Sequence, residues 1–128
     1  MVVNLGGVAA FAAASAARHL PAWCVGDATA RAAAAEGLAA RSAAGALDDL
    51  AGLLRREAAG LSLLQLRGRH VAGDLAALVG PSGPGITEAI VYEQEPVPLT
   101  PAARAALSGS APLHVPLFSP RSAGLMAP

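Results

Sequence analysis

The sequence lacks several residue types that whole classes of function require. Its 128 residues include a single cysteine and 3% aromatic residues, and all 9 basic residues are arginine, so lysine is absent. The lone Cys24 excludes an internal disulfide, and no Cys/His spacing indicates a zinc site. The formal net charge is +0. Without a basic stripe or interleaved aromatics, nucleic acid is not an expected partner.

Nucleotide-binding and membrane-spanning classes are also disfavoured. A phosphate-binding loop of the G-x-x-x-x-G-K-[ST] type needs a lysine, and no G-x-G-x-x-G follows an apolar run. The uncharged stretch Met1–Ala17 has no basic start, is interrupted by two glycines and owes its hydropathy mostly to alanine. Such a stretch fits neither a signal peptide nor a membrane span. We therefore expect a cytoplasmic protein in a reducing compartment, with no membrane partner.

Apolar runs alternate with alanine-rich helical stretches along the chain, which predicts an α/β layered fold. After a strand end at Met1–Val3, the expected strands are Ala22–Val25, Leu38–Arg41, Leu61–Leu66, Ile86–Gln94 and Leu113–Phe118. The expected helices are Gly7–Arg18, Ala28–Glu36, Ala46–Ala58, His70–Val79 and one from the Thr100-Pro101 start signal to about Leu107, with another start signal at Ser119-Pro120.

Three segments share a pattern in which an apolar run leads directly into a helical stretch: Ala22–Thr29, Leu63–His70 and Val115–Ser122. The first backbone N–H groups of a helix have no partner within it, and here they would lie at the carboxyl end of a strand. These donors, together with the positive end of the helix dipole, attract anions. The repetition predicts a cleft that holds a ligand with several negative charges.

A domain boundary is expected in Glu95–Thr100, where Pro96 and Pro98 prevent the chain from continuing as a central strand. The segment that follows is too short to bury a core by itself. Met1–Val3 is likewise too short for a complete buried strand. The sequence is therefore expected to be a central fragment of a longer protein.

Four pieces resemble uroporphyrinogen-III synthase, an enzyme family of haem biosynthesis, and bacterial members in particular. They are Leu20–Ala30, Leu66–Leu75, Ile90–Pro96 and Leu117–Ala123. Each piece alone is weakly specific, but all four occur in the family's order and span essentially the whole chain. Two departures stand out: Val3–Gly6 lacks the hydroxyl residue of the family's turn, and the second domain's own Thr-containing turn is absent.

The resemblance implies two α/β domains, one inserted into the other, joined by a two-stranded ladder and separated by an active-site cleft. Residues 1–89 would form most of the inserted domain, an incomplete flavodoxin-like domain with a parallel sheet. Residues 90–99 would form a ladder strand that links the domains. Residues 100–128 would begin the second α/β domain.

The same resemblance implies a reaction. The substrate would be hydroxymethylbilane, a linear tetrapyrrole with carboxylates on every ring, cyclised to uroporphyrinogen III with inversion of ring D and loss of water. No cofactor or metal would take part, and the full-length protein would be a monomer. Tyr92 would be the acid for hydroxyl loss, because a phenol stays protonated at neutral pH and can donate. The alternative is a tyrosine that only fills space at a domain junction.

The candidate substrate-binding residues are Gly26, Thr29, Arg67, Gly68, Ser119, Arg121 and Ser122. Glycine permits close backbone approach, and hydroxyl and guanidinium groups pair with carboxylates. Each has a plainer interpretation: Asp27 as a helix cap, Arg67 as an exposed strand end, and Ser119 as the cap of a helix with Pro120 at its first position. A different class of function also stays open, a non-catalytic α/β module that binds an anion or a protein partner.

Overall fold

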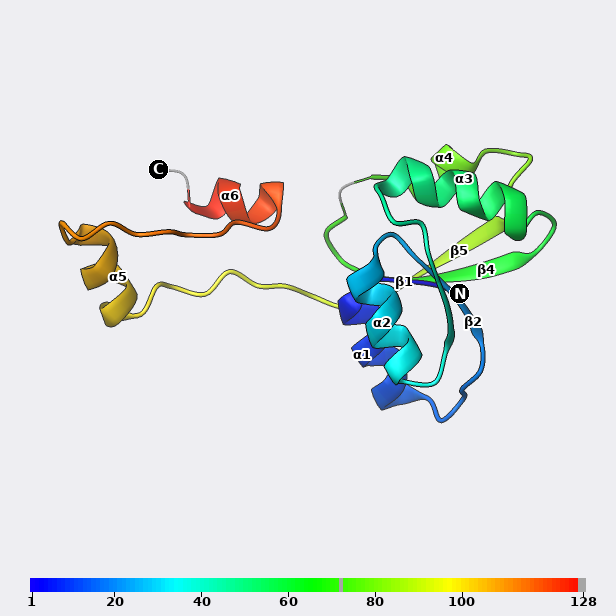
Figure 1. Cartoon of the computed structure of the whole chain (residues 1–128), viewed down its shortest axis with the longest axis horizontal. Helices are drawn as coiled ribbons and strands as arrows, with labels where there is room; N and C mark the ends of the chain where they lie inside the picture. Colours follow the sequence, from blue (N-terminus) through cyan, green and yellow to red (C-terminus); the bar gives the residue numbers. More distant parts are fainter. Residues whose placement is uncertain (72, 127–128) are drawn as a thin grey trace. The chain divides into compact units, whose positions relative to one another are not determined.

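The computed structural model describes residues 1–71 and 73–126 and divides into two compact units, Met1–Gln94 and Glu95–Pro128. The described residues of the first unit form five strands and four helices, and Figure 1 labels all of them except β3. In chain order they are β1 (Val2–Val3), α1 (Leu5–Ala14), β2 (Pro21–Cys24), α2 (Asp27–Ala35), β3 (Ala39–Ser42), α3 (Leu47–Glu57), β4 (Ser62–Gly68), α4 (Leu75–Val79) and β5 (Gly85–Tyr92). The second unit contains α5 (Pro101–Ser108) and α6 (Pro120–Met126).

The five strands form one sheet in the order β3-β2-β1-β4-β5, and all of their pairings are parallel. This confirms the predicted α/β class with a flavodoxin-like parallel sheet. On one side of β1 this sheet has two strands, β2 and β3, whereas flavodoxin has one strand on that side. The chain winds from β1 to β3 in one direction and then returns to β4 on the other side of β1. The order of strands therefore reverses between β1 and β4.

Two hydrophobic cores lie on opposite faces of the sheet. One joins Trp23 and Leu63 of the sheet to Leu50, Leu54 and Leu75 from α3 and α4. The other, beneath α1 and α2, is built from smaller side chains: Val3, Val8, Ala22, Cys24, Ala33, Leu38 and Leu66. Small residues bury less apolar area. The α3/α4 face therefore supplies more of the hydrophobic stabilisation than the α1/α2 face.

The helix boundaries follow from local capping. Asn4 caps α1 by accepting the Gly7 N–H at 2.8 Å, and Asp74 caps α4 by accepting the Ala77 N–H at 3.0 Å. Gly37 follows α2 with a φ of 81°, a left-handed conformation that glycine adopts without strain and that commonly ends a helix. The predicted start of α5 is also confirmed, because the Thr100 hydroxyl accepts the Ala103 N–H and Pro101 is the first helical residue.

Two predicted elements are wrong. The helix expected over His70–Val79 begins only at Leu75, because Asp74 accepts the Ala77 N–H and so defines the start of α4; Ala72 lies outside the described residues. The strand expected over Leu113–Phe118 does not form. Pro116 within it cannot donate a ladder hydrogen bond, and no described strand pairs with it. An apolar segment forms a strand only when another strand is available to pair with it.

Smaller differences concern the lengths of other elements. The helix predicted over Gly7–Arg18 is α1, which starts earlier at its Asn4 cap and ends at Ala14. The strand predicted to reach Gln94 ends at Tyr92, and its last residues pair in parallel with β4. Residues 90–92 of the expected ladder strand thus belong to the sheet of the first unit.

The second unit has no buried hydrophobic residue among its described positions. Its large apolar side chains are exposed, including Val97 at 82% and Phe118 at 93%. Ser119 caps α6 by accepting the Ser122 N–H at 3.1 Å, as predicted. Local hydrogen bonds, and not a core, define the two helices of this unit.

Candidate functional site at the carboxyl edge of the sheet

The reversal of strand order between β1 and β4 locates the candidate site. The chain leaves β1 toward α1 on one face of the sheet, and it leaves β4 toward α4 on the other. The two connections diverge and leave a crevice above the carboxyl ends of these strands, which is where open α/β sheets bind ligands. Asn4 follows β1 directly, and Arg69 follows β4.

A cavity of about 370 Å³ lies at this crevice. Its polar lining comes from Asn4 after β1, from Gln65 and Arg67 of β4, and from His70 in the loop that follows. Gln65 Oε1 and Arg67 Nε are buried and have no hydrogen-bond partner among the described residues. Buried polar atoms are normally satisfied. This cavity therefore offers an acceptor and a cationic donor to a polar ligand.

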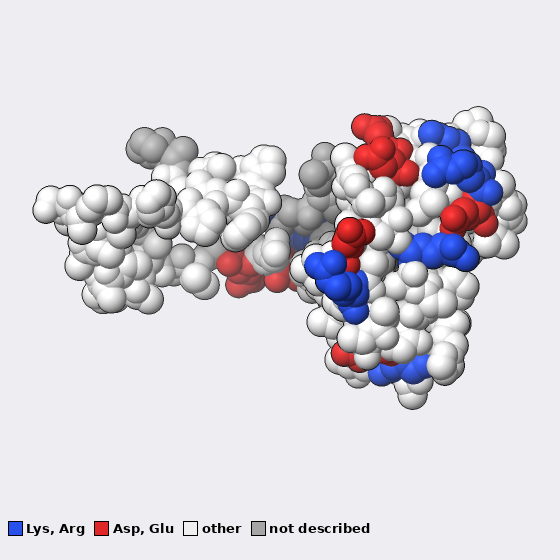
Figure 2. Space-filling view, in the orientation of Figure 1, with Lys and Arg blue, Asp and Glu red and all other residues white. Residues whose placement is uncertain are grey.

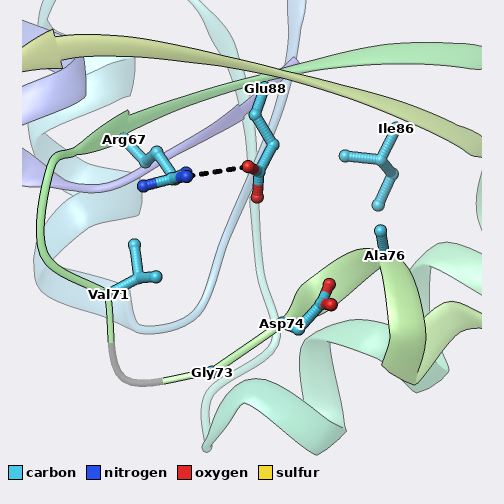
Figure 3. A pocket seen from close by; sticks show the side chains of 7 residues that line it. All are labelled: Arg67, Val71, Gly73, Asp74, Ala76, Ile86 and Glu88. Atoms are coloured by element: carbon cyan, nitrogen blue, oxygen red, sulfur yellow. Dashed lines mark hydrogen bonds and ion pairs between the residues drawn. The ribbon is translucent and has the colours of Figure 1, made fainter.

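A second cavity of about 600 Å³ lies between β4, β5 and α4, and Figure 3 shows the seven residues that line it. Arg67 belongs to the lining of both cavities. Its Nη2 atom forms an ion pair of 2.8 Å with Glu88 Oε2, and its side chain is only 17% exposed. The predicted alternative of an exposed arginine is therefore wrong: Arg67 is half-buried and already paired with a carboxylate.

Tyr92 ends β5 at the same edge of the sheet. Its phenol oxygen accepts a hydrogen bond of 2.6 Å from Asn4 Nδ2. A Cβ atom built on Gly6 would lie 2.6 Å from the Tyr92 ring, and one built on Gly68 would lie 2.7 Å from it. The ring thus lies beside α1, whereas the side chain of Arg67 faces the α4 side. Tyr92 and Gly68 are brought together, and Asn4 links Tyr92 to the smaller cavity.

The turn after β2 carries the other predicted binding residues of the first unit. Gly26 precedes α2 without a side-chain cap, and Thr29 is half-buried in the first helical turn. Asp27 is not the cap that the sequence suggested, because its Oδ1 accepts the Ser42 hydroxyl at 2.6 Å. This turn lies three strand spacings from β5, or roughly 14 Å. Gly26 and Thr29 therefore share the edge with Tyr92 but do not adjoin it.

The predicted residues of the second unit lie together at the start of α6. The Ser119 and Ser122 hydroxyl oxygens are 2.9 Å apart, and Arg121 lies between them in the sequence. Ser119 is thus a helix cap, and its predicted binding role stays a prediction.

Sequence reasoning missed two residues of the site, Asn4 and Gln65. Asn4 could have been found, because an asparagine directly after a strand and before a helix is a strong capping signal. Gln65 gives no such signal, since a polar residue inside an apolar strand is recognised as part of a cavity only when neighbouring strands are known.

Other kinds of site find no support in the described part of the chain. No group of three or more potential metal ligands occurs there. Burial raises the pKa of the Cys24 thiol, which disfavours the reactive thiolate. The charged residues of the first unit are intermixed on the face that Figure 2 shows, with no large patch of one sign. No helix among the described residues has the length and apolar character needed to cross a bilayer.

Comparison with known proteins identifies the family. No curated protein and no solved structure matches the chain. A family model described as uroporphyrinogen-III synthase HemD matches residues 5–126, which cover nearly all of both units and include every predicted site residue. The match agrees with the four resembling pieces and with the parallel α/β sheet. The chain belongs to the uroporphyrinogen-III synthase family.

Proposed function

We propose that this protein cyclises hydroxymethylbilane to uroporphyrinogen III, with inversion of ring D and loss of water. The observation that carries the proposal is the family match over residues 5–126, since the family is that of an enzyme of tetrapyrrole biosynthesis. The crevice at the reversal of strand order adds support, because it is the position where folds of this class bind small ligands.

Arg67 is the proposed principal carboxylate partner within the first unit. Its buried Nε atom is a donor without a partner among the described residues, and it lines the smaller cavity. Guanidinium groups bind carboxylates through charge-assisted hydrogen bonds. Gly26, Thr29 and Gly68 are proposed to add backbone or hydroxyl donors at the same edge. For Ser119, Arg121 and Ser122, substrate binding rests on the family resemblance.

Tyr92 is the proposed general acid. In the first step the C–O bond of the hydroxymethyl group breaks, the phenolic proton goes to the departing hydroxyl, and water leaves. The electrophilic azafulvene that remains is attacked by the ring D carbon that already carries the bridge to ring C, which gives a spiro intermediate. The old bond from that carbon to the bridge then breaks, and the bridge carbon bonds to the other α-carbon of ring D, so that the ring is inverted. The proton lost from carbon in the final step balances the proton that Tyr92 donated. The protein's main contribution besides this acid is the orientation of the folded tetrapyrrole.

The experiment that tests the proposal is an isomer analysis. The purified chain is incubated with hydroxymethylbilane, the products are oxidised to porphyrins, and the type I and type III isomers are separated by chromatography. We expect type III product in proportion to protein concentration. Exclusive formation of type I, the isomer of spontaneous closure, would overturn the proposal.

Two substitutions assign the roles. Tyr92→Phe removes only the hydroxyl, and we expect kcat to fall by about 10²–10⁴-fold, the usual contribution of a general acid. Arg67→Gln should mainly raise KM because it removes a carboxylate partner. Arg104→Gln, at an exposed position of α5, is the matched control and should leave both constants unchanged. Equal effects of the two arginine substitutions would contradict a specific role for Arg67.

A non-catalytic module that binds an anion or a protein partner is the second candidate. The observation in its favour is the exposure of large apolar side chains in the second unit, such as Phe118. Calorimetric titration with uroporphyrin, a stable polycarboxylate, separates the candidates when combined with the isomer analysis. Binding without any type III product would favour the second candidate.

Further aspects remain predictions that follow from the resemblance and composition. We propose that the full-length protein is a monomer in the cytoplasm that needs no cofactor and binds neither nucleic acid nor membranes. We also propose that residues 1–89 correspond to the inserted domain, residues 90–99 to the linker strand, and residues 100–128 to the start of the second domain. Gel filtration of the full-length protein tests whether it is a monomer.

A further inference from the structure

The amide of Asn4 makes two hydrogen bonds that together fix its orientation. Its Oδ1 atom accepts the Gly7 N–H at 2.8 Å as the cap of α1. A backbone N–H can only donate, so the oxygen must be the atom on that side. The NH₂ group is therefore directed to the other partner, the phenol oxygen of Tyr92, at 2.6 Å.

This orientation determines what the phenol can do. Because Asn4 Nδ2 donates, the Tyr92 oxygen is an acceptor in this contact, and the phenolic proton is not used by it. The proton remains available to another acceptor. A carboxylate or carbonyl at the position of Nδ2 would instead take the phenolic proton into a hydrogen bond with the protein.

The ring of Tyr92 is held as well as its oxygen. Gly6 of α1 and Gly68 of β4 both lie against the ring, and a Cβ atom on either would come within 2.6–2.7 Å of ring carbons. We call this space, bounded by Gly6 and Gly68, the glycine slot. The slot limits the positions of the Tyr92 ring, and the hydrogen bond from Asn4 makes the phenol oxygen an acceptor on that side.

We propose that Asn4 is a positioning residue for Tyr92: it holds the phenol oxygen as an acceptor so that the phenolic proton is directed to the departing hydroxyl of the substrate. This inference rests on the proposed function, because it assigns Asn4 to the same acid step. An asparagine suits both tasks because it has separate polar atoms, one for the Gly7 N–H and one for Tyr92. A single hydroxyl oxygen at this turn would have to serve both partners.

The test uses two substitutions that keep an acceptor for the cap of α1 but change the donor to Tyr92: Asn4→Asp removes it, and Asn4→Ser leaves one hydroxyl that would have to reach both partners. Asn4→Asp has nearly the same shape and is as good a cap, whereas Asn4→Ser is uncharged and shorter. Thr100→Ser, a conservative change at the cap of α5, is the matched control. Thermal unfolding of each variant verifies that the first unit still folds.

The first readout needs no substrate. Tyr92 is the only tyrosine of the chain, so tyrosine labelled with ¹³C at Cζ gives one NMR signal that reports on the hydrogen bond to its oxygen. We expect this signal to shift in both Asn4 variants and to stay unchanged in Thr100→Ser. An unshifted signal in the Asn4 variants would overturn the inference, whatever the activity of the chain.

The second readout is turnover. We expect kcat for type III product to fall about tenfold in Asn4→Ser, the effect of losing one hydrogen bond, with KM little changed. Asn4→Asp should lose at least as much, because the carboxylate binds the phenolic proton. Loss of activity in Asn4→Asp alone would show that charge repulsion of a polyanion is the cause and would overturn the positioning role. If the unmodified chain forms no type III product, the proposed function fails, and the NMR signal still decides whether Asn4 holds Tyr92.

Discussion

The two units of this chain are stabilised in different ways. Among the described residues of the first unit, 16 hydrophobic residues are buried in two cores, whereas those of the second contribute none. The second unit nevertheless contains two helices that begin at capping residues, Thr100 and Ser119. The comparison shows that local hydrogen bonds are enough to define where a helix begins. We expect cooperative unfolding only of the first unit, because burial over long sequence distances is what makes unfolding cooperative.

The largest effect should come from truncating a core leucine. Leu54 of α3 is 0% exposed, and Leu54→Ala should lower the free energy of unfolding of the first unit by about 2–5 kcal/mol through lost burial and a cavity. Leu107→Ala in α5, where the side chain is 42% exposed, should change it by less than about 0.5 kcal/mol. Urea unfolding followed by fluorescence of Trp23, the only tryptophan, measures both. If both substitutions lowered the free energy of unfolding by a similar amount, the contrast between a unit with a buried core and a unit without one would be contradicted.

A pair of helical glycines sharpens the comparison. Gly6→Ala places a methyl group against the Tyr92 ring and should cost about 1–3 kcal/mol, more than the gain in helix propensity. Gly124→Ala in α6 meets no described atom within 4 Å and should favour its helix by about 0.5–1 kcal/mol. The Trp23 transition reports on the first substitution, and circular dichroism at 222 nm reports on the second. An unaltered transition for Gly6→Ala would argue against the glycine slot.

The smallest effects are expected from the caps. Asp74→Ala and Thr100→Ala each remove one side-chain acceptor from a helix start, at a cost of about 1 kcal/mol. Leu75 and Val79 of α4 are buried, so the Asp74 substitution should lower the Trp23 midpoint. The Thr100 substitution should reduce helicity at 222 nm and leave that midpoint in place. A common shift of the midpoint by both variants would indicate that the two units unfold together.

The sequence was most informative where structure is set by neighbouring residues. The Thr100-Pro101 start of α5 was predicted because capping depends on a few adjacent positions. The strand expected over Leu113–Phe118 failed for the opposite reason. A strand needs a partner, and composition does not reveal whether a partner is within reach.

The candidate site was predicted in part. Tyr92, Gly68 and Arg67 were recognised from the family's order of motifs, and the parallel sheet brings all three to one edge. The hydrogen bond between Asn4 and Tyr92 joins residues 88 positions apart and depends on the strand order. The pairing of Arg67 with Glu88 also depends on the strand order, because it requires β4 and β5 to be neighbours. Such partners are fixed by topology, which local patterns do not contain.

The ion pair between Arg67 and Glu88 means that a ligand carboxylate must compete with the Glu88 carboxylate for Nη2 of Arg67. A carboxylated ligand that binds through Nη2 displaces Glu88, so it gains only the difference between two similar contacts. A ligand that instead engages Nε, which has no hydrogen-bond partner in the described part of the chain, leaves the ion pair intact. Arg67 would therefore discriminate between ligands by the direction from which they approach, more than it would raise the affinity for all of them.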